Sequence, residues 1–433
     1  MNGYNLVRSK EMFQKTQSGR GRQSGATRTS SGGRGRSQSP RRSGGFNRRP
    51  SSGGRGKKNV AQNIDPALFV RKAIQVTETT EFHPEHKFAD FHIHEKLKAN
   101  IAKRNYVHPT PIQDGAIPHI IKGRDVIGIA NTGTGKTAAF LIPLINKTFH
   151  KQNQKVLIMV PTRELAVQIE EEFREFSKGS GLLAATCIGG AHMDRQVRTL
   201  RQNPSFVIGT PGRVKDLIER GYLDLSLVNN VVLDEVDRML DMGFIQDIKY
   251  LLSLVQEERQ SLFFSATMEK TARELAEKFL NNPVTVAIKS RATSENVDQD
   301  VVHVSSREEK IELLHEILLQ PKSEKVVIFS RTKRGADRLS KLLESRGFKA
   351  GALHGDMSQG QRQRSMDAFR QGRLSVLVAT DVAARGLDID GVTHVINYDQ
   401  PATYEDYIHR IGRTGRGKNT GTALTFIEHF TRQ

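Results

Sequence analysis

Short apolar runs separated by helical patterns fill the chain from about residue 85 onward, and they restrict the folds open to it. Near-continuous apolar strands that alternate with helices are typical of a parallel sheet covered on both faces. The runs lie at 125–130, 155–160, 205–209, 230–234, 261–265, 284–288, 325–330, 349–353, 374–380 and 393–398, with helical patterns such as 163–178 and 269–280 between them. The polar stretch "KSRATSENVDQD" (289–300) divides these runs into two groups. The pattern predicts an α/β fold with two parallel-sheet domains in tandem.

The length of 433 residues leaves room for two cores of ordinary size and a tail. We expect the following organisation: a tail at 1–65, a flanking segment at 66–87, a first domain at 88–289, a linker at 290–298 and a second domain at 299–433.

The positive charge of the chain is concentrated at its N-terminus. Residues 1–60 hold 15 Lys and Arg against the single acid Glu11, whereas the remaining residues hold 51 basic and 46 acidic side chains. Residues 12–60 are mostly Gly, Ser, Arg, Gln and Pro, so we expect a disordered basic tail. Such a tail serves either as a solubilising segment or as a nonspecific nucleic-acid tether, because clustered cations release counterions from phosphate backbones.

Cysteine usage and hydropathy indicate the compartment. Cys187 is the only cysteine, which excludes an internal disulfide and fits a reducing compartment, and its apolar surroundings "LLAATCIGG" predict a packed thiol. The sequence has no apolar run long enough to span a membrane and no apolar core of a secretion signal near its start. We expect a cytoplasmic protein of bacterial origin, with a nucleus as the alternative if the source is eukaryotic.

The stretch "IANTGTGKTAAF" directly follows the first apolar run and precedes a helical pattern. Glycines allow the backbone to wrap phosphates, so Gly133 and Gly135 predict a phosphate loop in which Lys136 reaches the β and γ oxygens. Thr137 would offer its hydroxyl to Mg²⁺. Ala130 occupies a position where the general pattern has Gly.

Three carboxylates, Asp234, Glu235 and Asp237, stand at the end of the apolar run 230–234. Because ligands bind at the carboxyl ends of parallel strands, Asp234 is predicted to hold Mg²⁺ and Glu235 to polarise an attacking water. The metal and Lys136 would supply the positive charge that these acids require. The alternative, that the acids cap the following helix, remains open for Asp237.

The segment "YIHRIGRTGR" places Arg410, Arg413 and Arg416 three residues apart among glycines. This segment is either a solvated basic loop or a set of guanidinium groups that stabilise charge in a transition state. The second interpretation implies a nucleotide site that is completed when the second domain closes on the first.

These motifs and several others resemble, in order, those of the DEAD-box ATP-dependent RNA helicases of superfamily 2 over residues 88–427. The matching segments are "HPTPIQ" 108–113, "ANTGTGKT" 130–137, "PTRELAVQ" 161–168, "GG" 189–190, "TPGR" 210–213, "SAT" 265–267, "VIFSRT" 327–332, "QRQR" 361–364, "ATDVAARGLDI" 379–389 and "HRIGRTGR" 409–416. The resemblance implies two RecA-like domains that use ATP and Mg²⁺.

The resemblance also assigns roles to individual residues. It implies adenine recognition by Gln113 with Phe88 as a stacking ring, phosphate binding by Thr132, Gly133, Thr134, Gly135, Lys136 and Thr137, ribose contacts at Gly386 and Asp388, and γ-phosphate contacts from Arg413 and Arg416. It implies that Asp237 couples to Ser265, Thr267 and His409. It implies RNA contacts by Arg163, Gly190, Arg213, Arg331, Arg364 and Thr380, through sugar and phosphate and therefore with little sequence preference.

The chain departs from the family pattern at two positions. The signature tetrad reads "DEVD", with Val236 in place of Ala, and we expect its function to be kept and its local packing to change. Asn105 stands where Gly is usual, and Asn tolerates a left-handed backbone better than most side chains.

The resemblance implies an RNA-dependent ATPase that unwinds short RNA duplexes or remodels RNA–protein complexes, including partners in ribosome assembly. One alternative is an ATP-gated RNA clamp or annealing chaperone with little unwinding. A second alternative is a DNA helicase of the same superfamily, although the Gln113 motif and "SAT" resemble the RNA-acting branch.

Overall fold

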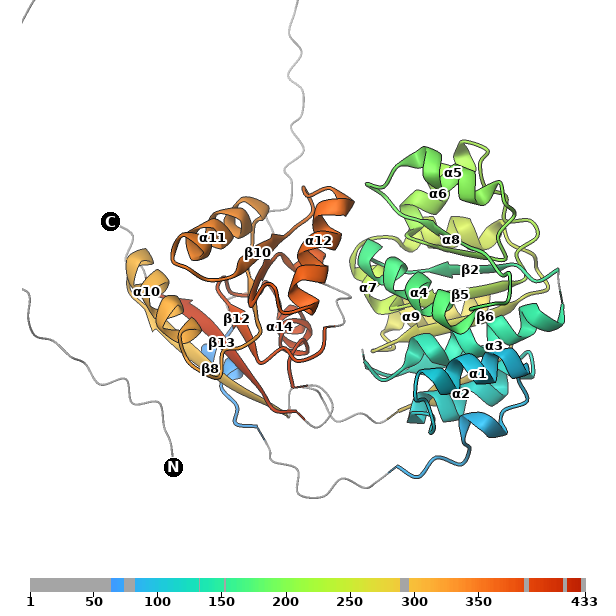
Figure 1. Ribbon diagram of the computed structural model, residues 1–433, viewed down its shortest axis with the longest axis horizontal. Coiled ribbons are helices and arrows are strands. Elements are labelled where there is room, and N and C mark those ends of the chain that lie inside the picture. Colours follow the sequence, from blue (N-terminus) through green and yellow to red (C-terminus); the bar gives the residue numbers. More distant parts are fainter. Residues whose placement is uncertain are drawn as a thin grey trace, which may run out of the picture. The chain divides into compact units, whose positions relative to one another are not determined.

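A computed structural model describes residues 64–73, 82–131, 133–151, 153–288, 296–384, 389–415 and 419–429. The predicted tail therefore lies almost wholly outside the described residues, as do most of the predicted linker and the site residues Thr132, Gly386, Asp388 and Arg416. Figure 1 shows the elements of the first sheet from blue to yellow-green and those of the second from orange to red.

The first domain contains a seven-stranded, all-parallel sheet of order β3-β4-β2-β5-β6-β1-β7. Its strands are β1 (Val126–Ile129), β2 (Val156–Met159), β3 (Ala184–Cys187), β4 (Phe206–Gly209), β5 (Asn230–Asp234), β6 (Gln260–Ser265) and β7 (Val284–Ala287). Its helices are η2 (Phe88–Asp90), α1 (Glu95–Lys103), α2 (Pro111–Ile121), α3 (Lys136–His150), α4 (Arg163–Phe176), α5 (Met193–Leu200), α6 (Pro211–Glu219), α7 (Val236–Asp241), α8 (Ile245–Ser253) and α9 (Lys270–Phe279).

Two apolar layers cover the faces of this sheet. Alternate residues of a strand point to opposite faces, and accordingly Val156 and Ile158 pack with helices α1 to α4 while Leu157 and Met159 pack with α5 to α9. Cys187 is buried in the second layer, which confirms the packed thiol, and burial raises its pKa to about 12.

The second domain contains a six-stranded, all-parallel sheet of order β10-β11-β9-β12-β13-β8. Its strands are β8 (Val297–Val304), β9 (Val326–Phe329), β10 (Ala350–Leu353), β11 (Val376–Ala379), β12 (His394–Asn397) and β13 (Gly421–Glu428). Its helices are α10 (Arg307–Leu318), α11 (Lys333–Ser345), α12 (Gln359–Arg370), α13 (Asp381–Ala384) and α14 (Tyr404–Ile411). The predicted α/β class with two parallel sheets is therefore confirmed.

Each apolar run identified in the sequence contains one strand, but three strands lie outside those runs. β3 and β13 were not predicted, and β8 begins at Val297, inside the stretch that was interpreted as a linker. β8 is the edge strand of its sheet and reads "VDQDVVHV", so its polar alternation hides it from a search for continuous apolar runs. Asn105 adopts a positive φ of 57°, as its substitution for Gly predicted.

Candidate ATP and RNA sites

The phosphate loop leaves the carboxyl end of β1 and leads directly into α3. Gly133 and Gly135 have φ angles of 82° and 92°, a left-handed conformation that favours glycine. Lys136 is the first residue of α3 and is almost fully buried, and its Nζ donates a hydrogen bond to the Ala130 carbonyl at 2.7 Å. The helix start and the lysine together provide positive potential where phosphates would bind.

Gln113 links α2 to this loop. Its Oε1 accepts from the Thr110 backbone N–H at 2.9 Å, and its Nε2 donates to the Gly135 carbonyl at 3.0 Å. A Cβ on Gly135 would lie 2.3 Å from that Nε2, so only glycine permits this close approach. Phe88, the predicted stacking ring, is buried against the rings of Phe91 and Tyr106.

The three acids after β5 point to three different partners. Asp234 Oδ1 accepts from the Glu235 backbone N–H at 2.9 Å. Both carboxylate oxygens of Glu235 accept from Arg238 Nη1, at 2.9 and 2.8 Å, and both side chains are buried. Glu235 itself has a φ of 55° and a ψ of 52°, a strained conformation for a side chain of this kind and a feature common at functional sites.

Arg238 is a residue that the sequence reasoning missed. The prediction assigned all the balancing charge to Lys136 and a metal, whereas the structure places a guanidinium one helical turn after Glu235. The i,i+3 spacing of the two residues at a helix start was the available signal. Removal of either partner of this buried ion pair would leave an unpaired charge in the protein interior, so the two side chains depend on each other.

Asp237 joins the signature tetrad to the "SAT" segment after β6. Its Oδ2 accepts from the backbone N–H groups of Ala266 and Thr267 at 3.0 and 2.9 Å, and its own N–H donates to Ser265 Oγ at 3.3 Å. The carboxylate also accepts from Thr267 Oγ1 at 3.3 Å. These contacts bring Asp237, Ser265 and Thr267 together as predicted, and they go beyond the role of a helix cap.

Burial is electrostatically unfavourable for the Asp234 carboxylate. Burial raises its pKa to about 7, the Lys136 ammonium acts in the opposite direction, and the charge of Glu235 adds to the increase. Because the side chain is only 2% exposed, water does little to compensate. A site that keeps a carboxylate under such strain is suited to a cation or a cationic complex.

The donor chemistry at this edge fits Mg²⁺. Asp234 and the Thr137 hydroxyl supply hard oxygen atoms, and Mg²⁺ usually binds through one or two protein oxygens while it keeps waters and phosphate oxygens as its other ligands. No group of three or more His, Cys, Asp or Glu side chains converges on one point within the described parts of the chain. This arrangement matches a metal that arrives with a nucleotide and not an all-protein cage.

The predicted RNA contacts of the first domain lie at the ends of β2, β3 and β4, on the side of the sheet away from β1 and the phosphate loop. Arg163 begins α4, and its guanidinium lies so close to Gly190 that a Cβ there would be 2.2 Å from Nη1. Arg213, in the first turn of α6, directs Nη1 to the Ala191 carbonyl at 3.5 Å. Arg163, Arg213 and a left-handed Gly190 (φ 75°) therefore form a basic surface, in which Arg213 Nε is also ion-paired with Asp216 Oδ2 at 3.6 Å.

The second domain presents its predicted RNA residues at the corresponding edge. Arg331 follows β9, where its backbone N–H donates to Asp399 Oδ2 at 2.7 Å, and Thr380 follows β11. Arg364 lies on α12, which follows β10 in the chain. Arg331 and Thr380 thus lie at the carboxyl ends of strands, where α/β sheets bind ligands, whereas Arg364 lies in the second turn of a helix.

The regularly spaced arginines have different environments. Arg410 is buried on α14, where Nε and Nη2 donate to the Asp381 carboxylate at 2.5 and 2.8 Å and Nη1 donates to Asn397 Oδ1 at 3.1 Å. Arg410 is therefore a structural anchor of α14 and not a group offered to a ligand, which corrects the interpretation of the three arginines as one set. Arg413 follows α14, and its Nε donates to the His409 carbonyl at 3.2 Å.

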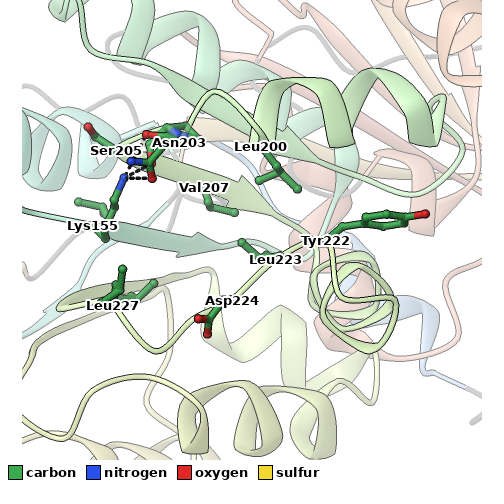
Figure 2. Close-up of a pocket in the computed structure, with 12 residues that line it drawn as sticks. Lys155, Leu200, Asn203, Ser205, Val207, Tyr222, Leu223, Asp224 and Leu227 are labelled. Atoms are coloured by element: carbon green, nitrogen blue, oxygen red, sulfur yellow. Dashed lines mark hydrogen bonds between the residues drawn. The ribbon is translucent and has the colours of Figure 1, made fainter.

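A cavity of about 200 Å³ lies at the opposite edge of the first sheet, near the amino ends of β2, β4 and β5. Figure 2 shows Lys155 donating to Asn203 there, with Leu200, Leu223 and Leu227 around the hollow. None of the predicted site residues lines this cavity, so it does not belong to the nucleotide site.

In the described part of the chain, no helix combines the length and apolar character needed to cross a bilayer.

The pKa of Asp234 generates a stability prediction for the ligand-free protein. An unfolded chain would lose this proton near pH 3.8, whereas the folded chain keeps it to about pH 7, so folding takes up a proton between these values and stability falls as the pH rises. Asp234→Asn removes this penalty. We expect the variant to gain up to about 4 kcal/mol in free energy of unfolding at pH 8, and nearly nothing at pH 4.

Denaturant unfolding at the two pH values measures this difference. Asp224→Asn is the control, because hydrogen bonds from Ser226 lower the pKa of that surface carboxyl, and its loss should bring no gain at pH 8. An Asp234→Asn gain that is equal at pH 4 and pH 8 would contradict the raised pKa.

Comparison with known proteins agrees with this geometry. Residues 110–275 match the model of the DEAD/DEAH box helicase family, and residues 309–418 match that of the helicase conserved C-terminal domain. The chain is 46% identical to the ATP-dependent RNA helicase CshA of Listeria monocytogenes over 344 residues, which is 79% of the chain and 66% of that relative. It is also 46% identical to the DEAD-box ATP-dependent RNA helicase CshA of Bacillus licheniformis, with 78% and 70% covered.

A solved structure extends the comparison to the fold. S. cerevisiae Dbp5 bound to RNA and ADP BeF3 is 30% identical, with a TM-score of 0.69 over 79% of this chain and 89% of that one. With two parallel sheets, a phosphate loop after β1 and the tetrad after β5, the chain belongs to the family of DEAD-box ATP-dependent RNA helicases.

Proposed function

We propose that the chain hydrolyses ATP when RNA induces closure of its two domains, and that it uses this cycle to open short RNA duplexes locally or to remodel RNA–protein complexes. The observation that carries the proposal is the chain of contacts along one edge of the first sheet. Gln113 contacts the phosphate loop, Asp234 stands beside Lys136, and Asp237 binds the "SAT" segment. The basic surface of Arg163, Gly190 and Arg213 lies at the same edge.

The residues of the first domain have separable roles in this proposal. Gln113 reads the adenine, Lys136 neutralises the β and γ oxygens, and Glu235 orients and polarises the attacking water. The Arg238 guanidinium holds the Glu235 carboxylate in place. Asp234 and Thr137 would hold Mg²⁺, which when bound neutralises charge on the phosphate oxygens.

The second domain would contribute Arg413 and Arg416 to the γ-phosphate, Gly386 and Asp388 to the ribose, and His409 to the link with Asp237. RNA would be held through its sugars and phosphates by the six predicted contacts, which gives little sequence preference and favours RNA over DNA through the 2′-hydroxyl. A bent single strand in the closed state excludes a regular duplex, so closure opens a few base pairs.

The tail is proposed as a tether that keeps RNA near the two domains. Its cations would bind phosphates without sequence preference and raise the local concentration of substrate. The relatives from Listeria and Bacillus support a bacterial source. A cytoplasmic location, with RNA–protein and ribosome-assembly complexes as substrates, is part of the proposal.

The competing proposal is an ATP-gated clamp or annealing chaperone with little unwinding. A clamp without turnover would be expected to lack a hydrolytic group, whereas Lys136, Glu235, Arg413 and Arg416 are all in the sequence. The Glu235–Arg238 pair also supports hydrolysis, because it fixes the side chain at the position of the proposed water-activating group.

Substitutions in the phosphate loop and the tetrad test the proposed hydrolysis. Lys136→Ala and Glu235→Gln should each lower ATP turnover to near background, because one removes phosphate neutralisation and the other the group that polarises water. Steady-state phosphate release measures turnover, and RNA binding should persist in both variants. Lys147→Ala, at the far end of α3, is the control for loss of a half-buried lysine from the same helix. Turnover by Glu235→Gln at the wild-type rate would remove the assignment of Glu235.

Deletion of residues 1–60 tests the tether. The truncated chain should bind RNA more weakly and with a flatter dependence on salt, because fewer counterions are released, while its ATPase rate without RNA stays unchanged. Fluorescence anisotropy of a labelled single strand at 50 to 300 mM salt is the measurement. A salt dependence equal to that of the full chain would leave the tail without this role.

A further inference from the structure

A short segment before the first domain belongs structurally to the second. Residues 64–73 precede all elements of the first sheet, yet Ile64 and Phe69 pack into the apolar layer formed by α12, α13 and α14 on the second sheet. Figure 1 shows this blue segment beside β8 and β13. Its helical turn η1 (Pro66–Phe69) is capped by Asp65, whose Oδ1 accepts from the Ala67 N–H at 2.9 Å.

Backbone hydrogen bonds fix the segment to the edge strand β8. The Arg71 N–H donates to the Gln299 carbonyl at 3.0 Å, and the Gln299 N–H donates to the Arg71 carbonyl at 2.7 Å. The Ala73 N–H donates to Asp298 Oδ1 at 3.0 Å. These bonds form an antiparallel bridge on the edge of an otherwise parallel sheet, where unpaired backbone groups would otherwise face solvent.

Phe69 is the apolar anchor of the segment. Its side chain is 0% exposed, while its neighbours Leu68 and Val70 are 51% and 49% exposed. Its ring lies 4.6 Å from the ring of Tyr407, and the Tyr407 hydroxyl donates to Gln299 Oε1 at 3.0 Å. The backbone of Gln299 therefore contacts the segment, and the side chain of Gln299 contacts Tyr407.

Tyr407 lies on α14, the helix that leads to Arg413. One turn after Tyr407, Arg410 fixes the same helix to Asp381 and Asn397. Arg413 begins the next turn and is tied back to α14 through the His409 carbonyl. Phe69 and Arg410 thus supply two independent contacts that set the position of α14, one apolar and one ionic.

We propose that Ile64–Ala73 is an integral part of the second domain and that Phe69 is a positioning residue for Arg413, acting through Tyr407 and α14. This inference rests on the proposed role of Arg413 in ATP hydrolysis. Phe69 touches neither nucleotide nor RNA in this account. It fixes the position of α14, and the position of Arg413 depends on that helix. Small displacements of a catalytic group lower the reaction rate strongly.

The test is a comparison of variants in the full chain by RNA-stimulated ATPase kinetics. Phe69→Ala removes the ring under Tyr407, and kcat should fall between about tenfold and about 100-fold. The KM for ATP should change much less than kcat, because Gln113 and the phosphate loop, which are predicted to bind the adenine and the β-phosphate, lie on the first domain. Phe69→Met keeps much of the apolar volume and should restore most of the kcat.

Two controls separate positioning from stability. Leu68→Ala alters the exposed neighbour in the same segment and should leave kcat unchanged. Leu314→Ala opens a cavity in the apolar layer on the opposite face of the second sheet, so it should lower the melting temperature while kcat at 25 °C is retained. Hydrogen exchange should be faster in α14 for Phe69→Ala and not for Leu314→Ala.

Each outcome has a definite meaning. A wild-type kcat in Phe69→Ala together with a large loss in Arg413→Ala would overturn this inference and leave the proposed function intact. Wild-type turnover in Arg413→Ala would overturn the proposed function itself. An equal loss of kcat in Phe69→Ala and Leu314→Ala would show that Phe69 acts through stability alone.

Discussion

The parallel arrangement of the strands is the constraint on which the rest of the structure depends. Parallel strands end at a common edge, so the loops after β1, β5 and β6 meet there although they are far apart in sequence. The phosphate loop, the acidic tetrad and the "SAT" segment are therefore neighbours without any long excursion of the chain. The loops after β2, β3 and β4 extend the same edge with Arg163, Gly190 and Arg213.

The polar groups at this edge are stabilised unequally. Glu235 is paired with Arg238, and Asp237 is held by two backbone N–H groups, so both charges are compensated within the fold. Asp234 has only partial compensation from Lys136, and burial raises its pKa. Asp234 therefore carries an electrostatic cost at the position where a cationic complex of ATP would relieve it.

The continuous apolar runs in the sequence predicted most strands of the two sheets. A strand that is buried on both faces is apolar along its whole length, so it appears in the sequence as such a run. This pattern missed β3, β8 and β13, in each of which buried residues alternate with partly exposed ones over much of the strand. It could not reveal that Phe69 packs against Tyr407, since a single aromatic residue in a polar segment shows no periodicity. Arg238 was missed for a different reason: the charge balance was sought in ligands and not in the next helical turn.

The central claim is that RNA gates ATP hydrolysis at this edge, and steady-state ATPase with and without single-stranded RNA tests it most directly, with DNA of the same sequence as the control. The account predicts strong stimulation by RNA and little by DNA, because RNA drives the domain closure that brings Arg413 to the nucleotide. RNA binding without stimulated hydrolysis would contradict this account and favour the clamp or chaperone. Val236 in the tetrad would then be the first residue to replace with Ala, the residue usual in the family.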